Sequence, residues 1–460
     1  MTKLATAPPG IEPTIRPKQK QRPIAIIGGG LAGLTAADYL DRNGVPFILF
    51  ESGEKIAGLA RSFKDEEGFS HDFGAHFLTN RLADAIGVGS ECITVKHYGE
   101  AVWIDGKCRS YPFGLAKLPR MVASFIKRKI SAVGRAQTPA SAAEWFQNSY
   151  GEALANEVAL PLIQAWSGAS ADELSPEVGE SLPGSIAKTL WLKVAAKLTG
   201  RAVACGYNRE KPEGAGVYHV YPKGGIAVIC EKLAEGLGDR IKLQSPVEAI
   251  TVANDLVTTV RAAGVTYEVA AVISTAPAPI LPRLVQGTDI LQRFADFRYR
   301  PMTFVNMRFE GRKLLPDTVV WVPQEDSPFF RLTEAPISMP WLAPEGKTII
   351  TADIGCQRDD EFWTMDDATI AERCLEHAES IIPGIRDRYL GCSVLRTPIA
   401  YPVFLNSYEQ ARQDFAHSTG VENLISVGRN GEFSHIFMED VYWRTLEKTG
   451  ELVRHLKQQS

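Results

Sequence analysis

A glycine-rich turn close to the amino terminus constrains the fold of this chain more than any other feature. An apolar run of strand length at residues 24–27 leads into Gly28, Gly30 and Gly33, which have the spacing G-x-G-x-x-G. Residues 34–43 follow, with apolar positions at helical intervals. A strand, a glycine turn and a helix in this order are typical of the first unit of a Rossmann-type dinucleotide-binding domain.

An acidic residue at the end of the next strand completes this unit. The apolar run at residues 46–50 ends at Glu51, whose carboxylate is placed to accept hydrogen bonds from the hydroxyls of an adenosine ribose. Gly28 allows a tight turn, Gly30 lets the backbone approach a pyrophosphate, and Gly33 lets the helix pack against the strand. The start of the helix adds free N–H groups and a positive dipole end for the phosphates. We therefore predict a dinucleotide site rather than an accidental glycine-rich turn.

Two segments after this unit resemble a known family. Residues 56–62 read IAGLARS and residues 69–77 read FSHDFGAHF. Together they resemble the opening of the FAD-dependent amine oxidase superfamily, which includes protoporphyrinogen oxidases, carotenoid desaturases and, more distantly, UDP-galactopyranose mutases. Those proteins usually have a Gly-Gly pair followed by an Arg. This chain has Ala57 where the first Gly is expected, while Gly58 and Arg61 stay in register. A simple nicotinamide domain has no need of this second element, so the resemblance implies FAD rather than NAD as the cofactor.

The carboxyl-terminal part carries a second element of the same resemblance. The apolar run at residues 423–427 ends in Gly428 and Arg429, and a helix is expected from about Met438. In the superfamily this strand returns beside the first one, and its glycine supplies a backbone N–H to the pyrophosphate. The resemblance therefore implies that the two distant glycine-bearing strand ends meet in space and hold one FAD between them.

The resemblance assigns cofactor contacts to positions along most of the chain. The residue that contacts the flavin at the start of the last helix is left open among Met438, Glu439 and Asp440. The backbone of Val247 is expected to contact the adenine. The implied cofactor-binding residues are Gly28, Gly30, Leu31, Ala32, Gly33, Glu51, Ser52, Gly58, Leu59, Ala60, Arg61, Gly74, Ala75, His76, Val247, Gly428, Arg429 and Met438.

Length and composition exclude several classes of protein. A chain of 460 residues exceeds the usual single-domain size, so two or three lobes are expected. The formal net charge of −4 gives no footprint for nucleic-acid binding. The seven cysteines are scattered without a C-x-x-C pair, so neither a metal site nor a disulfide framework is expected. Reduced, structural thiols are typical of a cytoplasmic protein.

The order of these features predicts an α/β fold with several parts. The FAD-binding domain is expected to be Rossmann-like, of the glutathione reductase type, and discontinuous, with a mixed-sheet substrate domain and a helical insertion. The predicted bounds are a disordered leader at 1–22, the FAD-binding domain at 23–114, 215–290 and 420–460, the helical insertion at 115–200 and the substrate-binding sheet domain at 291–419. Residues 101–113 are interpreted as a hairpin that turns at Asp105 and Gly106, and residues 241–250 as one strand.

The expected helical insertion begins with a basic amphipathic segment. Residues 117–135 interleave Arg120, Lys127, Arg128 and Lys129 with apolar side chains. Such a segment suits peripheral contact with an anionic membrane surface, and the alternative is a solvated helix face. The predicted location is the cytoplasm, at the membrane periphery if this segment binds lipid, and the oligomeric state is left open.

The resemblance implies redox chemistry on a small organic substrate. The leading hypothesis is hydride removal from a C–H bond beside nitrogen or in a conjugated system, with oxygen or another compound as electron acceptor. The candidate catalytic residues are His76 and Arg331. His76 resembles the flavin-side histidine of the mutases, and its alternative role is a hydrogen bond to a flavin edge or to the backbone. Arg331 could hold a carboxylate or phosphate by its planar fork, or form a salt bridge at a strand end. His435 lies near the predicted carboxyl-terminal flavin contact.

Two other functions are left open. A redox-neutral, flavin-dependent sugar-nucleotide mutase fits His76, the Tyr111-Pro112 hairpin and Arg429, but the second histidine of the mutases is missing after Phe77. The other alternative is a non-catalytic chaperone or subunit that binds FAD. Motifs typical of hydrolysis or phosphoryl transfer are absent from the sequence.

Overall fold

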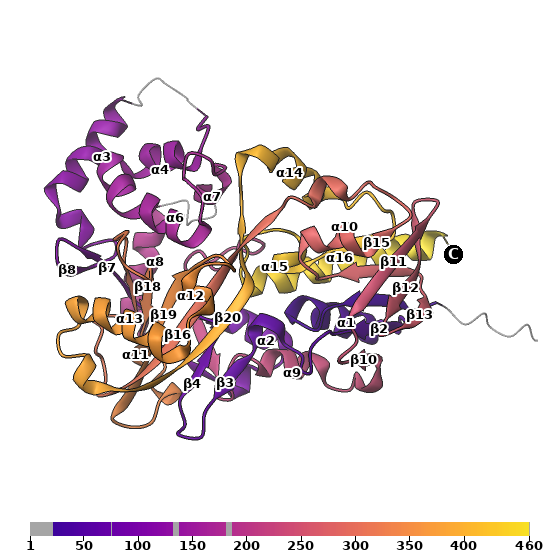
Figure 1. The fold of residues 1–460 in the computed structure, drawn as a ribbon, viewed down its shortest axis with the longest axis horizontal. Coiled ribbons are helices and arrows are strands. Elements are labelled where there is room, and N and C mark those ends of the chain that lie inside the picture. The colour runs from indigo at the N-terminus through magenta and orange to yellow at the C-terminus, as the bar shows by residue number, and fades with distance from the viewer. Residues whose placement is uncertain (1–21, 75, 132–137, 181–185, 460) are drawn as a thin grey trace, which may run out of the picture.

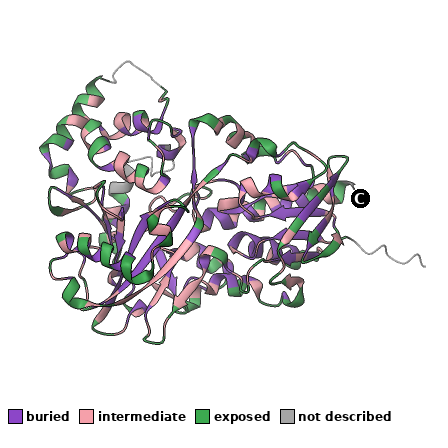
Figure 2. Cartoon of the chain, in the orientation of Figure 1, coloured by how far each residue is buried: buried purple, intermediate pink, exposed green. Residues whose placement is uncertain are grey.

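The computed structural model describes residues 22–74, 76–131, 138–180 and 186–459, and Figure 1 shows how they are arranged. Of the predicted leader at 1–22, residues 1–21 lie outside this range, as does the predicted cofactor contact Ala75. Two sheet regions lie side by side, and a helical part extends from one of them (Figure 1). Figure 2 shows that the buried residues concentrate in the strands of both regions, whereas the helical part is more exposed.

The first region is built on five parallel strands in the order β10-β2-β1-β14-β21. They are β1 Ile24–Ile27, β2 Phe47–Phe50, β10 Ile241–Lys242, β14 Ala271–Ser274 and β21 Leu424–Ser426. Ile24 and Ile26 of the central β1 pack in one core with the helices α1 Leu31–Arg42 and α16 Met438–Gln459. Ala25 and Ile27 pack in a second core on the opposite face. Because the strand is buried on both faces, it has the short, continuous apolar run that the sequence shows.

A smaller sheet covers the second face of this region. Its order is β13-β12-β11-β15, with β11 Val247–Ala253, β12 Leu256–Ala262, β13 Val265–Glu268 and β15 Val285–Gln286. The single strand predicted at 241–250 is therefore wrong. Residues 241–242 belong to the parallel sheet, whereas the chain from Val247 belongs to the smaller one. Gln244 between them has φ 50°, a left-handed conformation that interrupts a strand.

The second region is a seven-stranded sheet in the order β20-β16-β19-β18-β17-β7-β8. The strands are β7 Glu100–Ile104, β8 Lys107–Ser110, β16 Arg298–Glu310, β17 Val319–Trp321, β18 Arg331–Thr333, β19 Lys347–Gly355 and β20 Tyr389–Val403. All neighbours are antiparallel except β17 and β7. Helix α13 Asp367–Ile381 buries its apolar side chains in a core shared with this sheet.

The predicted hairpin forms, but it lies in a different region from the one expected. Asp105 and Gly106 both have positive φ, 52° and 67°, which suits the tight turn between β7 and β8. The sequence interpretation placed this hairpin in the FAD-binding segment 23–114. Instead, β7 pairs in parallel with β17 and so covers an edge of the second sheet that would otherwise have unpaired backbone groups.

The helical part lies between β8 and β9 His219–Pro222. Its main helices are α3 Pro119–Ser131, α4 Ala142–Tyr150, α5 Glu152–Leu154, α6 Leu160–Ser167, α7 Glu177–Glu180 and α8 Ile186–Thr199, with a π-helical turn at Ala155–Ala159. Within the described ranges, no helix combines the length and the apolar character needed to cross a bilayer.

Short elements connect the larger parts. The hairpin of β3 Ser62–Lys64 and β4 Ser70–Asp72 and the small sheet β5-β9-β6 follow the first nucleotide unit. The other connecting elements are β5 Leu78–Thr79, β6 Cys92–Thr94, α2 Asn80–Ile86, α9 Val228–Ala234, α10 Leu281–Leu284, α11 Ala335–Ser338, α12 Glu361–Thr364, α14 Glu409–His417 and α15 Gly428–Gly431.

Candidate functional site

The glycine turn between β1 and α1 combines one tightly packed position with one open position. A Cβ at Gly33 would lie 1.9 Å from the carbonyl oxygen of Gly28, so only glycine allows this contact between helix and strand. A Cβ at Gly30 would meet no atom within 4 Å. Leu31 and Ala32 begin α1, whose first turn has no acidic residue and no side-chain cap. The backbone at Gly30 and the positive end of α1 therefore face space that a phosphate group can occupy.

Glu51 closes the other side of this turn. Its Oε2 accepts a hydrogen bond of 2.7 Å from the backbone N–H of Gly29, and its Oε1 accepts one of 2.7 Å from Gly53. The Ser52 hydroxyl also contacts Oε1, at 3.3 Å. Oε1 thus already accepts from two donors, whereas Oε2 keeps a second lone pair for a further donor. Glu51 can therefore still accept a hydrogen bond from a ribose hydroxyl, and this contact stays a prediction.

The segment after Glu51 folds back onto the glycine turn. The N–H of Ala57 donates to the carbonyl oxygen of Gly29 at 2.8 Å, and a Cβ at Gly58 would lie 3.5 Å from the Cα of Gly30. Ala57 has φ 84°, a left-handed conformation that is costly for a residue with a Cβ. Ala57 stands where the superfamily usually has glycine, and its backbone keeps the left-handed conformation that glycine adopts easily. The short 3₁₀ turn Gly58–Ala60, which includes Leu59, leads on to Arg61.

The carboxyl-terminal glycine reaches the same place, as the sequence predicts. Strand β21 pairs with β14, which in turn pairs with β1. Gly428 follows β21 with φ 85°, and a Cβ there would lie only 2.7 Å from the Cβ of Ala32 at the start of α1. The two glycine-bearing strand ends, about 400 positions apart in the sequence, therefore lie against each other.

The residues present fit a dinucleotide such as FAD. The open backbone at Gly30 and the adjacent helix start suit a pyrophosphate, which carries negative charge. Two arginines near these glycines supply complementary charge, because the buried Nε of Arg61 and the buried Nε and Nη2 of Arg429 have no hydrogen-bond partner in the protein. Unpaired buried donors of this kind are rare in proteins, so they favour a bound anionic group.

A buried ion pair forms the centre of the second part of the site. Arg331 of β18 pairs with Asp353 of β19, and the Asp353 side chain is fully buried. Burial raises the pKa of the Asp353 carboxyl, while Arg331 opposes this shift. The salt bridge considered as one alternative for Arg331 is therefore present, and its Nε is still without a partner. The guanidinium lies 5.4 Å from the ring centre of Trp321.

Arg429 provides a second buried cation beside this pair. Its guanidinium lies 4.8 Å from the ring centre of Tyr401, and burial lowers the pKa of Arg429. Within the described residues Arg429 forms no ion pair with a carboxylate. His435 stacks on Trp166 at 5.6 Å between ring centres and meets Tyr401 edge-on at 5.8 Å. Two guanidinium groups with only one paired carboxylate leave the site with excess positive charge.

His76 lies close to both arginines. Burial, together with the charges of Arg429 and Arg331, lowers the pKa of His76 to about 4. The imidazole is therefore neutral near pH 7, and its buried Nδ1 has no hydrogen-bond partner. Gly74 is part of the same cluster, because a Cβ there would lie 3.1 Å from Phe304 and 3.5 Å from Arg331 Nη2. The structure thus brings the candidates His76, Arg331 and Arg429 together.

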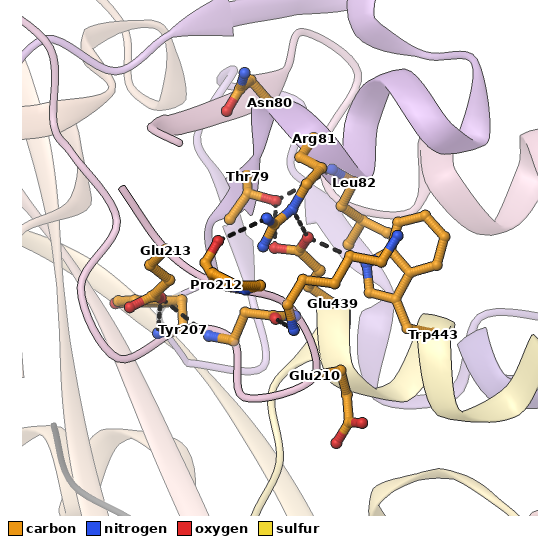
Figure 3. Close-up of polar contacts among 12 residues, drawn as sticks. Thr79, Asn80, Arg81, Leu82, Tyr207, Glu210, Pro212, Glu213, Glu439 and Trp443 are labelled. Carbon is orange, nitrogen blue, oxygen red and sulfur yellow. Dashed lines mark hydrogen bonds and ion pairs between the residues drawn. The ribbon is translucent and has the colours of Figure 1, made fainter. Parts of the chain in front are cut away.

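The two acidic residues at the start of α16 are both engaged in contacts within the protein. Figure 3 shows Glu439 accepting from Thr79, Arg81 and Trp443, so its carboxylate is fully engaged in holding α16 against β5 and α2. Asp440 accepts from the backbone N–H groups of residues 209 and 210. Met438 packs against the core of the first region, and its contact with the flavin stays a prediction.

Val247 lies near Glu51, on the side of the glycine turn where the adenine is predicted to bind. It begins β11, and the N–H of Ser245 just before it donates to the carbonyl oxygen of Glu51 at 2.8 Å. Strand β10 places the preceding residues beside the end of β2. This position is compatible with the predicted backbone contact, which stays a prediction.

Sequence reasoning missed three residues of the site. Asp353 is a charged residue within an apolar strand, and such a buried carboxylate requires a cation nearby, so this signal was present in the sequence. Tyr401 belongs to a Tyr-Pro element that resembles one facing the active site in related proteins, but it was not named as a candidate site residue. Asp72 stands shortly before Gly74, where the superfamily usually has an Asp or Glu before a Gly, but it was not named as a site residue.

Comparison with protein families gives a match over most of the chain. The model described as "Flavin containing amine oxidoreductase" matches residues 31–442. This match confirms the predicted resemblance, and FAD is confirmed as the cofactor.

Individual relatives are distant. The chain is 24% identical over 257 residues to protoporphyrinogen oxidase 2, chloroplastic/mitochondrial, of Arabidopsis thaliana, covering 50% of each chain. It is 26% identical over 277 residues to the lycopene-forming phytoene desaturase of Pseudescherichia vulneris, covering 55% of each chain. The match thus spans about half the length of these relatives. Among solved structures, reduced UDP-galactopyranose mutase superposes with a TM-score of 0.77 at 20% identity, covering 94% of this chain and 96% of the other. That similarity confirms the predicted fold class.

Proposed function

The chain belongs to the flavin containing amine oxidoreductase family, and from this premise we propose that it is an FAD-dependent oxidoreductase. The proposed reaction removes hydride from a C–H bond beside nitrogen, or in a conjugated system, of a small organic substrate. One observation carries the proposal. Arg429, which belongs to the buried cationic site, directly follows Gly428, which packs against the start of α1. A cofactor held at the glycine turns would therefore extend toward the buried site.

The protein side of this reaction is binding, orientation and exclusion of water. The flavin, when bound, supplies the hydride acceptor. Aromatic side chains from different elements line the site, including Trp166, Trp321 and Tyr401, and they provide apolar contact area for an organic substrate. His76 is neutral near pH 7, so it can donate or accept a hydrogen bond without adding charge.

The charge of the site indicates the substrate class. Arg331 is neutralised by Asp353, whereas Arg429 has no carboxylate partner among the described residues. Because a buried unpaired cation is unfavourable, an anionic group of the cofactor or the substrate is expected beside it. We propose that the substrate carries a carboxylate or phosphate in addition to the oxidised C–H bond.

Anaerobic reduction of the bound flavin tests this proposal. The FAD-loaded protein is mixed without oxygen with amines, porphyrinogens and carotenoids, each with and without a carboxylate, and the visible absorbance of the flavin is followed. The expected result is bleaching by a carboxylated member of one class and restoration of the colour when oxygen or another acceptor is added. Bleaching by neutral compounds at equal rates would contradict the anionic substrate class. No bleaching by any class would contradict the oxidoreductase proposal.

A redox-neutral sugar-nucleotide mutase is the second candidate. Two buried guanidinium groups, Arg331 and Arg429, suit the two phosphates of a nucleotide sugar as well as they suit a carboxylate. The two candidates differ in their need for prior reduction. Turnover of a nucleotide sugar only after dithionite reduction, with no net oxidation, would favour the mutase.

We also propose that helix α3 contacts an anionic membrane surface. Val122, Ile126 and Ile130 form an exposed stripe along α3, with side chains 38%, 51% and 68% exposed. Lys127 and Lys129 flank the stripe, and α3 has no acidic residue. Exposed apolar side chains with flanking lysines are typical of helices that lie in a bilayer interface. Residues 132–135 of the predicted segment lie outside the described residues.

Vesicle binding tests the membrane contact. The protein is expected to sediment with vesicles that contain phosphatidylserine at low salt, and less with uncharged vesicles. The double change Ile126→Ser/Ile130→Ser should remove this binding, because it removes the most exposed part of the stripe. Val265→Ser is the matched control, since Val265 is 52% exposed but lies on β13 in the other region. Equal loss in both variants, or no binding by the unaltered protein, would contradict the proposal.

A further inference from the structure

A buried carboxyl group links three segments that surround the proposed cofactor site. Asp72, the last residue of β4, is 6% exposed. Its Oδ1 accepts a 2.6 Å hydrogen bond from the Ser62 hydroxyl, and its Oδ2 accepts a 2.8 Å hydrogen bond from the Tyr221 hydroxyl. Ser62 directly follows Arg61, and Tyr221 lies on β9. Asp72 itself is two positions before Gly74, so the three segments are fixed to one another through a single side chain.

Both hydroxyl groups donate to Asp72, and each hydroxyl oxygen also accepts a backbone N–H. The Ser62 oxygen accepts from the N–H of Ala227 at 3.3 Å, and the Tyr221 oxygen accepts from the N–H of Ile226. The remaining neighbour is His76, whose Nδ1 lies 3.8 Å from Asp72 Oδ2 and has no other partner.

The charges around this pair favour a protonated carboxyl beside a neutral imidazole. Burial raises the pKa of Asp72 to about 7, although the hydrogen bonds from Ser62 and Tyr221 oppose the shift. Burial lowers the pKa of His76 to about 4, and Arg429 and Arg331 contribute in the same direction. The groups that face the pair are thus two hydroxyl groups on the Asp72 side and two guanidinium groups on the His76 side. In water the order is reversed, because a free histidine binds a proton more tightly than a free aspartate.

We infer that Asp72 is a positioning residue that donates a hydrogen bond from its protonated carboxyl to Nδ1 of His76. This contact fixes the imidazole in the tautomer with hydrogen on Nε2, so that His76 presents an N–H donor to the reacting site. The 3.8 Å separation is about 1 Å longer than a hydrogen bond, so the proposed contact requires the imidazole to move toward Asp72. The inference rests on the proposed function in one respect, namely that His76 faces the cofactor or substrate.

The tautomer can be measured without turnover. Protein labelled with ¹⁵N-histidine and loaded with FAD gives separate nitrogen shifts for Nδ1 and Nε2, and His76→Gln assigns the His76 signals. The unaltered protein should show hydrogen on Nε2 at pH 6. Asp72→Asn should keep this pattern, because an amide N–H₂ also donates to Nδ1. Asp72→Leu should lose it, because leucine has a similar size but no donor. An Asn variant that loses the pattern as completely as the Leu variant would overturn the inference.

The pH dependence of activity is the second measurement. With a substrate found by the flavin-bleaching assay, kcat/KM should fall about tenfold per pH unit above about pH 7, as Asp72 loses its proton. Asp72→Asn should remove this fall, because an amide does not ionise. Tyr221→Phe should move the fall to higher pH, because it removes a hydrogen bond that stabilises the ionised carboxyl. Persistence of the fall in Asp72→Asn would overturn the inference.

A matched control separates this effect from a general one of the hairpin. Asp65 lies on the turn of the same β3–β4 hairpin, where it pairs with Arg308 and does not contact His76. Asp65→Asn should leave both the tautomer and the pH profile unchanged. Failure of the oxidoreductase proposal alone would leave the tautomer experiment intact, so the two failures are distinguishable.

Discussion

The two regions of this protein build their halves of the site from different parts of the chain. In the five-stranded region the site is mostly backbone, and Gly30 and Gly428 matter because they lack a side chain. In the seven-stranded region the site is mostly side chains, and Arg331 pairs with Asp353 on the next strand. A site made of backbone atoms is determined by a short local sequence motif. A side-chain site depends on strand pairing between residues that are distant in the sequence.

Replacement of Gly30 should give the largest effect and should separate ligand binding from folding. A Cβ at Gly30 meets no atom within 4 Å, so Gly30→Val should fold but fill the space that faces the pyrophosphate, with affinity for FAD at least about 100-fold lower. If the Gly30→Val protein kept the yellow colour of bound FAD, the contrast drawn between a backbone site and a side-chain site would be wrong. The measurements are FAD titration and circular dichroism of the apoprotein.

Two further glycine variants are the controls for this experiment. Gly33→Ala should reduce folding stability itself, because its Cβ would lie 1.9 Å from a backbone oxygen of the turn. Gly214→Val should change neither FAD binding nor folding, since a Cβ at Gly214 would meet no atom within 4 Å and Gly214 lies in the loop before β9.

Removal of Arg331 should have the next largest effect, on stability. Arg331→Met leaves Asp353 buried without a partner and should lower the free energy of unfolding by about 3 kcal/mol, measured by urea unfolding in excess FAD. Arg331→Met/Asp353→Asn should regain most of that loss. Arg308→Met is the surface control and should cost less than about 1 kcal/mol, because its partners Asp65 and Glu67 are partly exposed. Equal losses in the single and double variants would show that no such pair exists.

A buried histidine should make stability depend on acid pH. Burial lowers the pKa of His219 to about 4, whereas the unfolded residue titrates near its ordinary value of 6.5. Its contribution to stability is therefore present above about pH 6.5 and is lost as the pH falls toward 4. His219→Gln should reduce the loss of stability across this window by up to about 1.4 kcal/mol per pH unit, measured by urea unfolding at several pH values.

His97 is the opposite case and serves as the comparison. A hydrogen bond with Asp317 raises the pKa of His97, so its contribution is present below pH 6.5 and is lost as the pH rises through the folded-state pKa. His97→Gln should therefore make the acid loss slightly steeper. The same change of slope in both variants would contradict the assigned environments.

Replacement of Ala57 should have the smallest effect and the opposite sign. Ala57 has φ 84°, which an L-residue adopts at a cost of about 1–2 kcal/mol, whereas glycine adopts it freely but loses more chain entropy on folding. Ala57→Gly should therefore raise the free energy of unfolding by about 0.5–1 kcal/mol, measured by urea unfolding. A lower free energy would show that the methyl group, which is buried, contributes more through packing than the strained conformation costs.

The sequence predicted the first region better than the second for a physical reason. Gly28, Gly33 and Glu51 act through local geometry, so their spacing alone indicates the strand, the turn and the acidic residue. The pairing of β7 with β17 joins residues about 220 positions apart, and local periodicity holds no information about it. The hairpin was accordingly placed in the wrong region, although its turn was correct.

The same reason limits prediction of individual site residues. Arg331 was recognised as a candidate, but its partner Asp353 follows from the register of β18 and β19 rather than from any motif. Asp72 illustrates the limit most clearly. Its hydrogen bonds to Ser62 and Tyr221 span 10 and 149 positions, and only the folded chain shows that they converge.

The position of β14 between β1 and β21 has a consequence for how the protein is made. Residues 275–423 leave the first sheet after β14 and build most of the second region before the chain returns as β21. During synthesis the ribosome must therefore release some 150 residues before the last strand and Gly428 are available to the nascent first sheet. We expect flavin to bind only after translation is nearly finished. Until then the apolar strands of the unfinished first sheet must be protected from aggregation.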